Sequence, residues 1–375
     1  MRCKDIGPPD AKIMLVGECP GASEEKTGVP FSGSSGLLLK QMLSHSGIQF
    51  RDCYVTNVVN VRPPKNNFDY FYNDKMPSHE LQEGIDTLRK KIEAIRPQVV
   101  MPLGREALKA VCNKSLINEY RGTWLSYRGI NVLPTYHPAY IMRVYKDHVV
   151  SELDFTKALT QVPQDNPPMI LAPNLSQVSR WISDVMEKHK NSDIRVAFDI
   201  ETIEKNVRCI AFYTKDYPAI CIPFIRFSSS EMGSVGQTVV KVGSSSTCMG
   251  SYWSPKEEVI IIGMLNNFFL SGIPVVGQNS IGFDAPLLED EFGFHIKNHF
   301  LDTMHAWHCL YSELPMGLGF LCSVLTNYRN YWTDKVTADD MSEWTYNCMD
   351  AVVTHDVAIK IEKELKETDV LDAIK

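Results

Sequence analysis

Residues 196–202 read Val-Ala-Phe-Asp-Ile-Glu-Thr, and this stretch decides the fold expected for the C-terminal half of the chain. The apolar run Val196–Ile200 predicts a β-strand, in which Asp199 and Glu201 stand two residues apart. Side chains at positions i and i+2 of a strand emerge on the same face. The two carboxylates can therefore approach one metal ion.

Two later segments carry further polar side chains of the same kind. Asp284 ends the stretch Asn-Ser-Ile-Gly-Phe-Asp, and Tyr346 and Asp350 begin and end the stretch Tyr-Asn-Cys-Met-Asp. A spacing of four residues places Tyr346 and Asp350 on one face of a helix. Magnesium prefers a few carboxylates with water and phosphate oxygens, and two such ions stabilise both oxygens of a reacting phosphodiester. The set indicates a metal-dependent nuclease.

In this order and approximate spacing, FDIET, NSIGFDAPLL and YNCMD resemble the three exonuclease motifs of the DnaQ-like DEDD superfamily, in its tyrosine subclass. The resemblance covers about residues 175–370 and implies a ribonuclease H-like 3′→5′ exonuclease domain with two Mg²⁺ or Mn²⁺ ions. By position, Tyr346 matches the tyrosine that orients the attacking water. The metal ligands that it implies are Asp199, Glu201, Asp284 and Asp350.

Residues 301–304 and 314–326 also look like the proofreading domain of phage family A-type DNA polymerases. In those proteins a polymerase domain follows the third exonuclease motif. We therefore expect single-stranded 3′ ends of DNA as the substrate. A DNA polymerase is the expected partner, either as a domain after Lys375 or as a separate polypeptide.

The N-terminal half alternates strand-like and helical patterns. Apolar runs at Ile13–Val16, Tyr54–Val59, Gln98–Leu103 and Asn131–Leu133 predict strands, and Leu81–Ile95 has the spacing of a helix. Alternation of this kind predicts a parallel α/β domain, whose sites gather at the carboxyl ends of the strands.

Three features lie at those strand ends. Residues 17–33 form a loop rich in glycine and proline, Asn57 lies within the second strand-like run, and His137 follows the fourth. The loop taken alone is a βα turn, and a single histidine near a strand end is more often structural than catalytic. The amide of Asn57, however, offers both an acceptor and a donor to the edge of a pyrimidine.

Together these segments resemble the family 4 uracil-DNA glycosylases over about residues 8–160. The matching stretches are GECPGASEEKTGVPFSG, TNVVNVRPP, IRPQVVMPLG and TYHPAYIMR. The resemblance implies an α/β/α domain that extrudes uracil from DNA into a pocket. Phe31 would stack on the base, Asn57 would bind its Watson–Crick edge, and His137 would stabilise the charge on the leaving uracil.

The same resemblance places three more residues in the uracil site. Glu18 stands among the catalytic residues, and Gly21 and Glu24 line the uracil-binding loop. Which group activates water stays open. The alternative is a domain without catalysis, which reads uracil or a modified base in DNA or docks another replication protein.

Family members hold an iron–sulfur cluster through four cysteines, and this chain departs from that pattern. Val61 and Gly84 stand at two of the ligand positions, and only Cys3 lies near a third. Because thiolates are required to hold such a cluster, we expect none here.

Composition bounds the remaining possibilities. The ten cysteines are scattered without a C-x-x-C pair, which favours reduced thiols in a cytoplasm, that of the host if the protein is viral. No apolar run of about 18 residues or secretory signal is present, so we expect no membrane partner. The net charge of −7 divides into +4 for residues 1–160 and −11 for residues 161–375. A basic first half suits a phosphate backbone, and an acidic second half suits one only through bound metal ions.

The proline-rich stretch TQVPQDNPPMILAP marks the expected boundary between the halves. We predict a glycosylase-like domain over 1–160, a linker over 161–174 and an exonuclease domain over 175–375. In the second domain we expect a helix at Ser176–His189, a hairpin or surface insertion within Phe227–Ser254 and a last helix at Ala351–Glu367.

Overall fold

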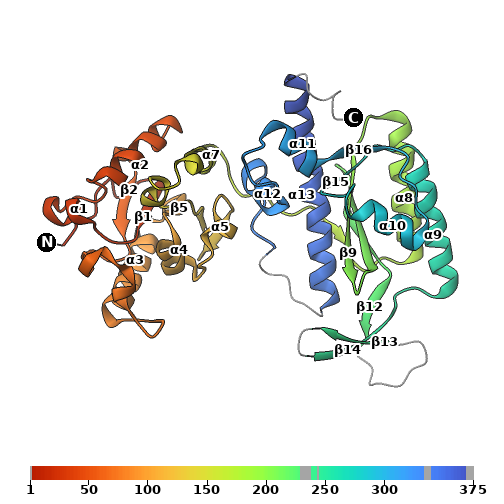
Figure 1. Ribbon diagram of the computed structural model, residues 1–375, viewed down its shortest axis with the longest axis horizontal. Helices are drawn as coiled ribbons and strands as arrows, with labels where there is room; N and C mark the ends of the chain where they lie inside the picture. The colour runs from red at the N-terminus through yellow and green to blue at the C-terminus, as the bar shows by residue number, and fades with distance from the viewer. Residues whose placement is uncertain (1, 229–237, 243–244, 333–338, 369–375) are drawn as a thin grey trace. The chain divides into compact units, whose positions relative to one another are not determined.

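The chain forms two compact units in the computed structural model, which describes residues 2–228, 238–242, 245–332 and 339–368 (Figure 1). The first unit comprises Met1–Asp165 and Asn327–Asn330, and the second comprises Asn166–Thr326 and Tyr331–Lys375. The boundary falls within the proline-rich stretch, and four residues from late in the sequence belong to the first unit. The predicted α/β class with two domains is confirmed.

The first unit is built on a five-stranded sheet with the order β2-β1-β5-β7-β6. The first four strands are parallel, and β6 is an antiparallel edge strand. The strands are β1 (Ile13–Gly17), β2 (Tyr54–Asn57), β5 (Val99–Pro102), β6 (Leu125–Tyr127) and β7 (Ile130–Val132). The predicted strands are all present, although the second ends at Asn57 rather than Val59.

Alternate residues of β1 face two different apolar layers. Ile13 and Leu15 pack with α2 (Ser34–His45), α6 (Pro138–Ile141) and α7 (His148–Thr160). The intervening Met14 and Val16 pack with α3 (His79–Ile95) and α4 (Arg105–Cys112). Because a strand buried on both faces must be apolar throughout, this burial explains the continuous run Ile-Met-Leu-Val. The unit is therefore a three-layer α/β/α sandwich.

The remaining elements of the first unit are short and lie in its loops. They are α1 (Ala22–Thr27), η1 (Phe50–Asp52), η2 (Pro64–Asn66), η3 (Phe68–Phe71), β3 (Tyr72–Asn73), β4 (Met76–Pro77), α5 (Ile117–Tyr120) and η4 (Tyr145–Asp147).

A buried ion pair supports the end of β7. Arg121 and Asp154 are almost fully inaccessible and form a direct ion pair, with Arg121 Nε 3.1 Å from Asp154 Oδ2. The hydroxyl of Thr135 donates to the same carboxylate oxygen at 2.8 Å. Since Thr135 precedes His137 by two residues, the pair fixes the backbone that leads into the predicted histidine motif.

The second unit contains a six-stranded sheet with the order β16-β15-β9-β10-β11-β8. Only β10 runs against the other five. The strands are β8 (Met169–Ile170), β9 (Val196–Ile203), β10 (Asn206–Tyr213), β11 (Ala219–Pro223), β15 (Val275–Gly277) and β16 (His299–Asp302). An antiparallel meander of three strands, extended on its first strand by two parallel strands, is the ribonuclease H-like arrangement, as predicted.

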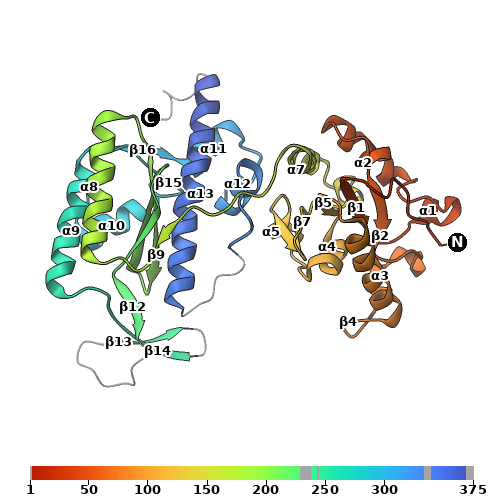
Figure 2. The ribbon, with the colours of Figure 1, turned by 180° about the vertical axis from the view of Figure 1, so that it is seen from behind.

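Helices cover both faces of this sheet (Figures 1 and 2). On one face, α8 (Leu175–Asn191), α9 (Pro255–Leu270) and α10 (Asp284–Phe292) share an apolar core with the strands. On the other face α13 (Asp340–Glu367) packs on the strands and is contacted by α11 (Thr303–Leu310) and α12 (Leu318–Leu325). The last helix thus begins 11 residues before the predicted Ala351, so Tyr346 and Asp350 belong to one continuous helix.

A small antiparallel sheet with the order β12-β14-β13 projects from the second unit (Figure 1). Its strands are β12 (Ile225–Ser228), β13 (Thr238–Val242) and β14 (Ser245–Ser251). They coincide with the segment Phe227–Ser254 for which a hairpin or insertion was predicted, except that β12 begins two residues earlier, and parts of that segment lie outside the described residues. Among the helices of the described chain, none combines the length and apolar character needed to cross a membrane.

Candidate active sites

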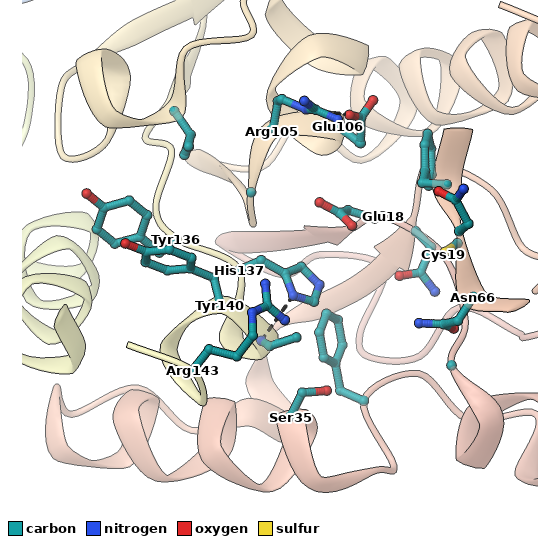
Figure 3. Close-up of a pocket in the computed structure, with 18 of the residues that line it drawn as sticks. Glu18, Cys19, Ser35, Asn66, Arg105, Glu106, Tyr136, His137, Tyr140 and Arg143 are labelled. Atoms are coloured by element: carbon teal, nitrogen blue, oxygen red, sulfur yellow. Dashed lines mark hydrogen bonds and ion pairs between the residues drawn. The ribbon is translucent and has the colours of Figure 1, made fainter. Parts of the chain in front are cut away.

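A cavity of about 630 Å³ opens at the carboxyl ends of the strands in the first unit (Figure 3). Glu18 follows β1, Asn57 ends β2, Arg105 follows β5, and His137 lies five residues beyond β7. All the residues predicted for the uracil site line this cavity: Glu18, Gly21, Glu24, Phe31, Asn57 and His137.

Phe31 and Asn57 form one wall of the cavity next to Gly17. A Cβ atom placed on Gly17 would lie 2.3 Å from Asn57 Oδ1 and 2.8 Å from Phe31 Cζ, so any larger residue here would displace both side chains. Asn57 is 6% exposed, and its side-chain amide makes no hydrogen bond with any residue that the structure describes. Its donor and acceptor are therefore available to a ligand.

His137 presents a defined tautomer to the cavity. Its Nδ1 accepts a hydrogen bond from the backbone N–H of Ala139 at 3.1 Å. Burial, followed by the positive charge of Arg143, lowers the pKa of His137 to about 4. The ring is therefore neutral near pH 7, with its one proton on Nε2. It can donate a hydrogen bond without carrying a charge.

The pKa of Glu18 is shifted in the opposite direction to that of His137. Burial, reinforced by the negative charge of Glu106, raises the pKa of the Glu18 carboxyl to about 7, while Arg105 acts against the shift. Gly104 adopts a φ of +89°, and a Cβ on it would lie 2.9 Å from His137 Cβ and 3.0 Å from Glu18 Oε1. Glycine at this position thus keeps open the space between the two groups.

Glu24 and Gly21 shape the loop after β1. The buried Glu24 accepts a hydrogen bond through Oε1 from the backbone N–H of Gly33 at 3.0 Å, which closes the loop. A Cβ on Gly21 would lie 2.8 Å from Glu24 Oε2. The loop geometry alone accounts for these two residues, and their contact with a base stays a prediction.

Many residues that line the cavity were not singled out from the sequence, among them three polar ones. Asn66, Arg105 and Arg143 all line the cavity, and Figure 3 shows Arg143 beside His137. Arg143 ends the histidine motif TYHPAYIMR, so a cation six residues after the histidine was the available signal. Asn66 follows from no local pattern, since it enters the cavity through a turn with a φ of +57°.

The acidic residues of the second unit converge from three elements. Carboxylate oxygens of Asp199 and Glu201 on β9 and of Asp350 on α13 lie within 4.8 Å of one another. Asp284, the first residue of α10, lies outside this group of three. Its Oδ1 accepts a hydrogen bond at 3.1 Å from the backbone N–H of Ile200, the residue between the two acids of β9.

Burial and mutual repulsion make these acids costly to ionise. Burial, followed by the charges of Asp350, Asp284 and Glu201, raises the pKa of Asp199 well above its usual range. Burial likewise raises the pKa of Asp284 to about 7. Three oxygen donors at this separation, with phosphate and water completing the shell, suit Mg²⁺ or Mn²⁺. The residues present therefore fit the predicted metal ions.

Two neutral residues contact these acids and were not predicted. Asn347 donates through Nδ2 to Asp199 Oδ2 at 2.7 Å, and Tyr331 donates through its hydroxyl to Asp350 Oδ1 at 2.6 Å. The predicted Tyr346 also hydrogen-bonds to Asp350, and burial raises its pKa. The rings of Tyr331 and Tyr346 are 5.7 Å apart.

Comparison with known proteins supports the predicted resemblance of the first unit to uracil-DNA glycosylases. Residues 4–161 match the model of the uracil DNA glycosylase superfamily. The type-4 uracil-DNA glycosylase of Thermotoga maritima is 41% identical over 140 residues, which are 36% of this chain and 68% of that protein. The chain belongs to the uracil DNA glycosylase superfamily. The type-4 uracil-DNA glycosylase of Archaeoglobus fulgidus is 34% identical over 161 residues, 40% of this chain and 77% of the relative.

A third relative is similar over a longer stretch of the chain. The DNA polymerase of Bacillus phage SP01 is 26% identical over 215 residues, which cover 54% of this chain. That share exceeds residues 4–161, so the similarity includes part of the second unit. The chain spans about a fifth of that polymerase, 22% of its length.

The chain also has a low similarity to two solved structures. The catalytic core of RRP6 from Trypanosoma brucei has a TM-score of 0.36 at 16% identity and covers 68% of this chain and 64% of its own. The EXD2 exonuclease domain soaked in Mn and GMP has a TM-score of 0.24 at 11% identity, covering 53% and 93%. The ribonuclease H-like fold of the second unit is established by its own strand order.

The first unit does not fit a four-thiolate iron–sulfur cluster. Val61 and Gly84 stand at two expected ligand positions and offer no thiolate. A Cβ on Gly84 would lie 2.5 Å from the carbonyl oxygen of Val58, so no side chain fits there. Burial raises the pKa of the remaining Cys3 thiol to about 11, which opposes thiolate formation.

Proposed function

We propose that the chain is a DNA-processing enzyme of phage replication type with two activities. The first unit excises uracil from DNA, and the second removes nucleotides from DNA 3′ ends with two divalent cations. The observation that carries the proposal is the pairing of a neutral His137 and a high-pKa Glu18 in one cavity of the first unit, together with a group of three carboxylates within the second unit. The likeness to a phage DNA polymerase supports a polymerase domain or subunit as partner.

Uracil recognition follows from the cavity wall. A uracil extruded from the duplex would stack on Phe31. The amide of Asn57, which has no hydrogen-bond partner among the described residues, would bind its Watson–Crick edge. Because a site built for hydrogen bonding rejects ligands that leave its polar groups unpaired, Asn57 would select the base. Arg143, an exposed residue that lines the cavity, would contact a phosphate.

Excision needs charge to move from the sugar to the base. As the C1′–N1 bond breaks, its electron pair passes to the uracil ring. The Nε2–H of His137 would donate to the uracil oxygen on which this charge collects. A water oxygen then bonds to C1′, and the Glu18 carboxylate would accept the proton that this water releases.

For the exonuclease, Asp199, Glu201, Asp284 and Asp350 would hold the cations, and Tyr346 would orient the attacking water. Bound in pairs, such cations supply charge stabilisation to the attacking and leaving oxygens of the phosphodiester. The carboxylates on β9 and α13 would determine the positions of the cations, because both elements belong to the packed core of the unit.

A second candidate function is a reader of uracil or of a modified base without excision. The loss of the cluster ligands favours this alternative, whereas the retained Phe31, Asn57 and His137 favour excision. Excision beside a polymerase would also create an abasic site that is hard to copy. Binding alone avoids that conflict.

One oligonucleotide experiment tests both activities. A 5′-labelled strand with a single internal uracil is incubated with the full chain in EDTA and then treated with hot alkali. A band at the uracil position that disappears in Asn57→Ala supports excision, since the glycosylase reaction needs no metal. A missing band together with retained uracil binding supports the reader.

Adding Mg²⁺ to the same reaction tests the nuclease. We expect shortening from the 3′ end that Asp350→Ala abolishes and Asp356→Ala, on the same helix outside the group of three, retains. Degradation that survives in Asp350→Ala would refute the metal site.

A further inference from the structure

Two hydrogen bonds to acids of the exonuclease site come from neutral side chains that the motifs did not include. Asn347 lies between Tyr346 and Asp350 on α13 and is fully buried, and its Nδ2 is 2.7 Å from Asp199 Oδ2. Tyr331 lies in the segment before α13, and its hydroxyl is 2.6 Å from Asp350 Oδ1. Neither residue belongs to the set predicted from the motifs.

The orientation of the Asn347 amide is fixed from behind. Its Oδ1 accepts hydrogen bonds from the thiols of Cys209 on β10, at 3.4 Å, and Cys221 on β11, at 3.8 Å. Thiols in this buried place are donors, so they select the amide oxygen and leave the NH₂ group for Asp199. The sheet therefore dictates which end of Asn347 meets the acid.

Aromatic packing fixes Tyr331 in the same manner. Its ring lies 5.7 Å from that of Tyr346 and 5.3 Å from that of Trp332, centroid to centroid. Trp332 in turn packs on Gly319 of α12, where a Cβ would lie 3.3 Å from the indole. The Tyr331 hydroxyl is thus directed at Asp350 by contacts that do not involve the acid.

Neutral donors suit a site that must later receive cations. A lysine or arginine would compensate the carboxylate charge and compete with the metal, whereas an amide or a phenol orients the carboxylate and leaves its charge in place. A carboxylate has about four acceptor positions, so it can keep such a bond and still bind an ion.

We propose that Asn347 and Tyr331 are positioning residues of the exonuclease site, which hold Asp199 and Asp350 in the rotamers that bind the cations. The inference rests on the proposed nuclease function. Partners that orient metal ligands contribute about 10- to 100-fold to metal affinity. Without either hydrogen bond, the same acids would bind more weakly because they must be ordered during binding.

The test measures Mn²⁺ binding to the full chain by the electron paramagnetic resonance signal of free Mn²⁺. Tyr331→Phe removes one hydroxyl and keeps the ring, so we expect the dissociation constant for Mn²⁺ to rise about 10-fold or more. Tyr311→Phe is the matched control, because Tyr311 donates to Glu364 on the same helix outside the group of three. We expect it to bind Mn²⁺ like the wild type.

Asn347→Leu provides an independent variant of similar shape, for which we expect a comparable loss of affinity. Exonuclease rates at saturating Mn²⁺ separate the two tyrosines: Tyr331→Phe should recover most of the wild-type rate, and Tyr346→Phe should not. Wild-type affinity in both Tyr331→Phe and Asn347→Leu would overturn the inference. A wild-type chain that binds no Mn²⁺ would instead overturn the proposed function.

Discussion

Replacing Glu18 by glutamine should stabilise the glycosylase unit and impair its chemistry together. The folded protein raises the pKa of this carboxyl from 4.5 to about 7. The folded state therefore keeps a proton that the unfolded chain releases between these pH values. The buried carboxyl therefore lowers the free energy of unfolding. This cost is absent below about pH 4.5, grows as the pH rises and is complete above about 7, where it reaches at most about 3 kcal/mol. Glutamine does not carry this cost.

Hydrogen exchange of backbone amides in β1 and β5, followed by mass spectrometry at pH 5 and pH 8, measures the stability of this unit within the full chain. We expect Glu18→Gln to slow exchange relative to the wild type at pH 8 and to have a much smaller effect at pH 5. Glu83→Gln, an exposed change on α3, should have no effect at either pH. A stabilisation of equal size at both pH values would refute the reasoning.

The catalytic side of the same variant has its own pH signature. If the Glu18 carboxylate accepts the proton of water, wild-type excision should increase with pH through a midpoint near 7, because the carboxylate forms there. His137 stays neutral across this range. Glu18→Gln should lose this increase with pH, and its excision rate should be about 100-fold or more lower. If the excision rate of the variant still increased with pH through the same midpoint, a group other than Glu18 would be responsible.

Three further outcomes follow from the structure. Asn57→Ala should weaken binding of uracil-containing DNA about 10-fold or more. Amide exchange in β2 should stay unchanged, because the Asn57 side chain makes no hydrogen bond with a described residue. Loss of the fold in this variant would contradict the prediction. Asp350→Ala should abolish Mg²⁺-dependent degradation. It should not lower the midpoint of thermal unfolding, measured by scanning calorimetry, because it also removes the repulsion between Asp350 and Asp199. Asp154→Ala should destabilise the glycosylase unit by about 3–5 kcal/mol by leaving Arg121 buried without its carboxylate, and a hydrogen-exchange change under 1 kcal/mol would count against it.

The sequence predicted those features that depend on local periodicity. The apolar runs around β1 and β9 and the spacing of Asp199 and Glu201 are local, so the strands and the shared face followed directly. The glycosylase pocket residues lie in loops directly after predicted strands, and the parallel topology brings such loops together. These parts of both sites required no knowledge of distant contacts.

Features that depend on distant partners were not predictable. The pKa of Glu18 is raised partly by Glu106, which lies 88 positions later in the sequence. Tyr331 meets Asp350 across 19 residues, through a segment without apolar periodicity. The early start of α13 was missed because residues 340–350 mix acids with aromatic side chains, and their burial is decided by the sheet that they cover.

Gly17 and Gly104 have a practical consequence for mutational screens of this protein. Each fills no chemical role, yet a single methyl group at either position would intrude on the side chains around the base pocket. Alanine scanning would score both positions as strongly as true reacting groups. Product yield alone therefore cannot rank residues here, and libraries meant to change base preference should leave these two codons fixed and vary the side chains that face them.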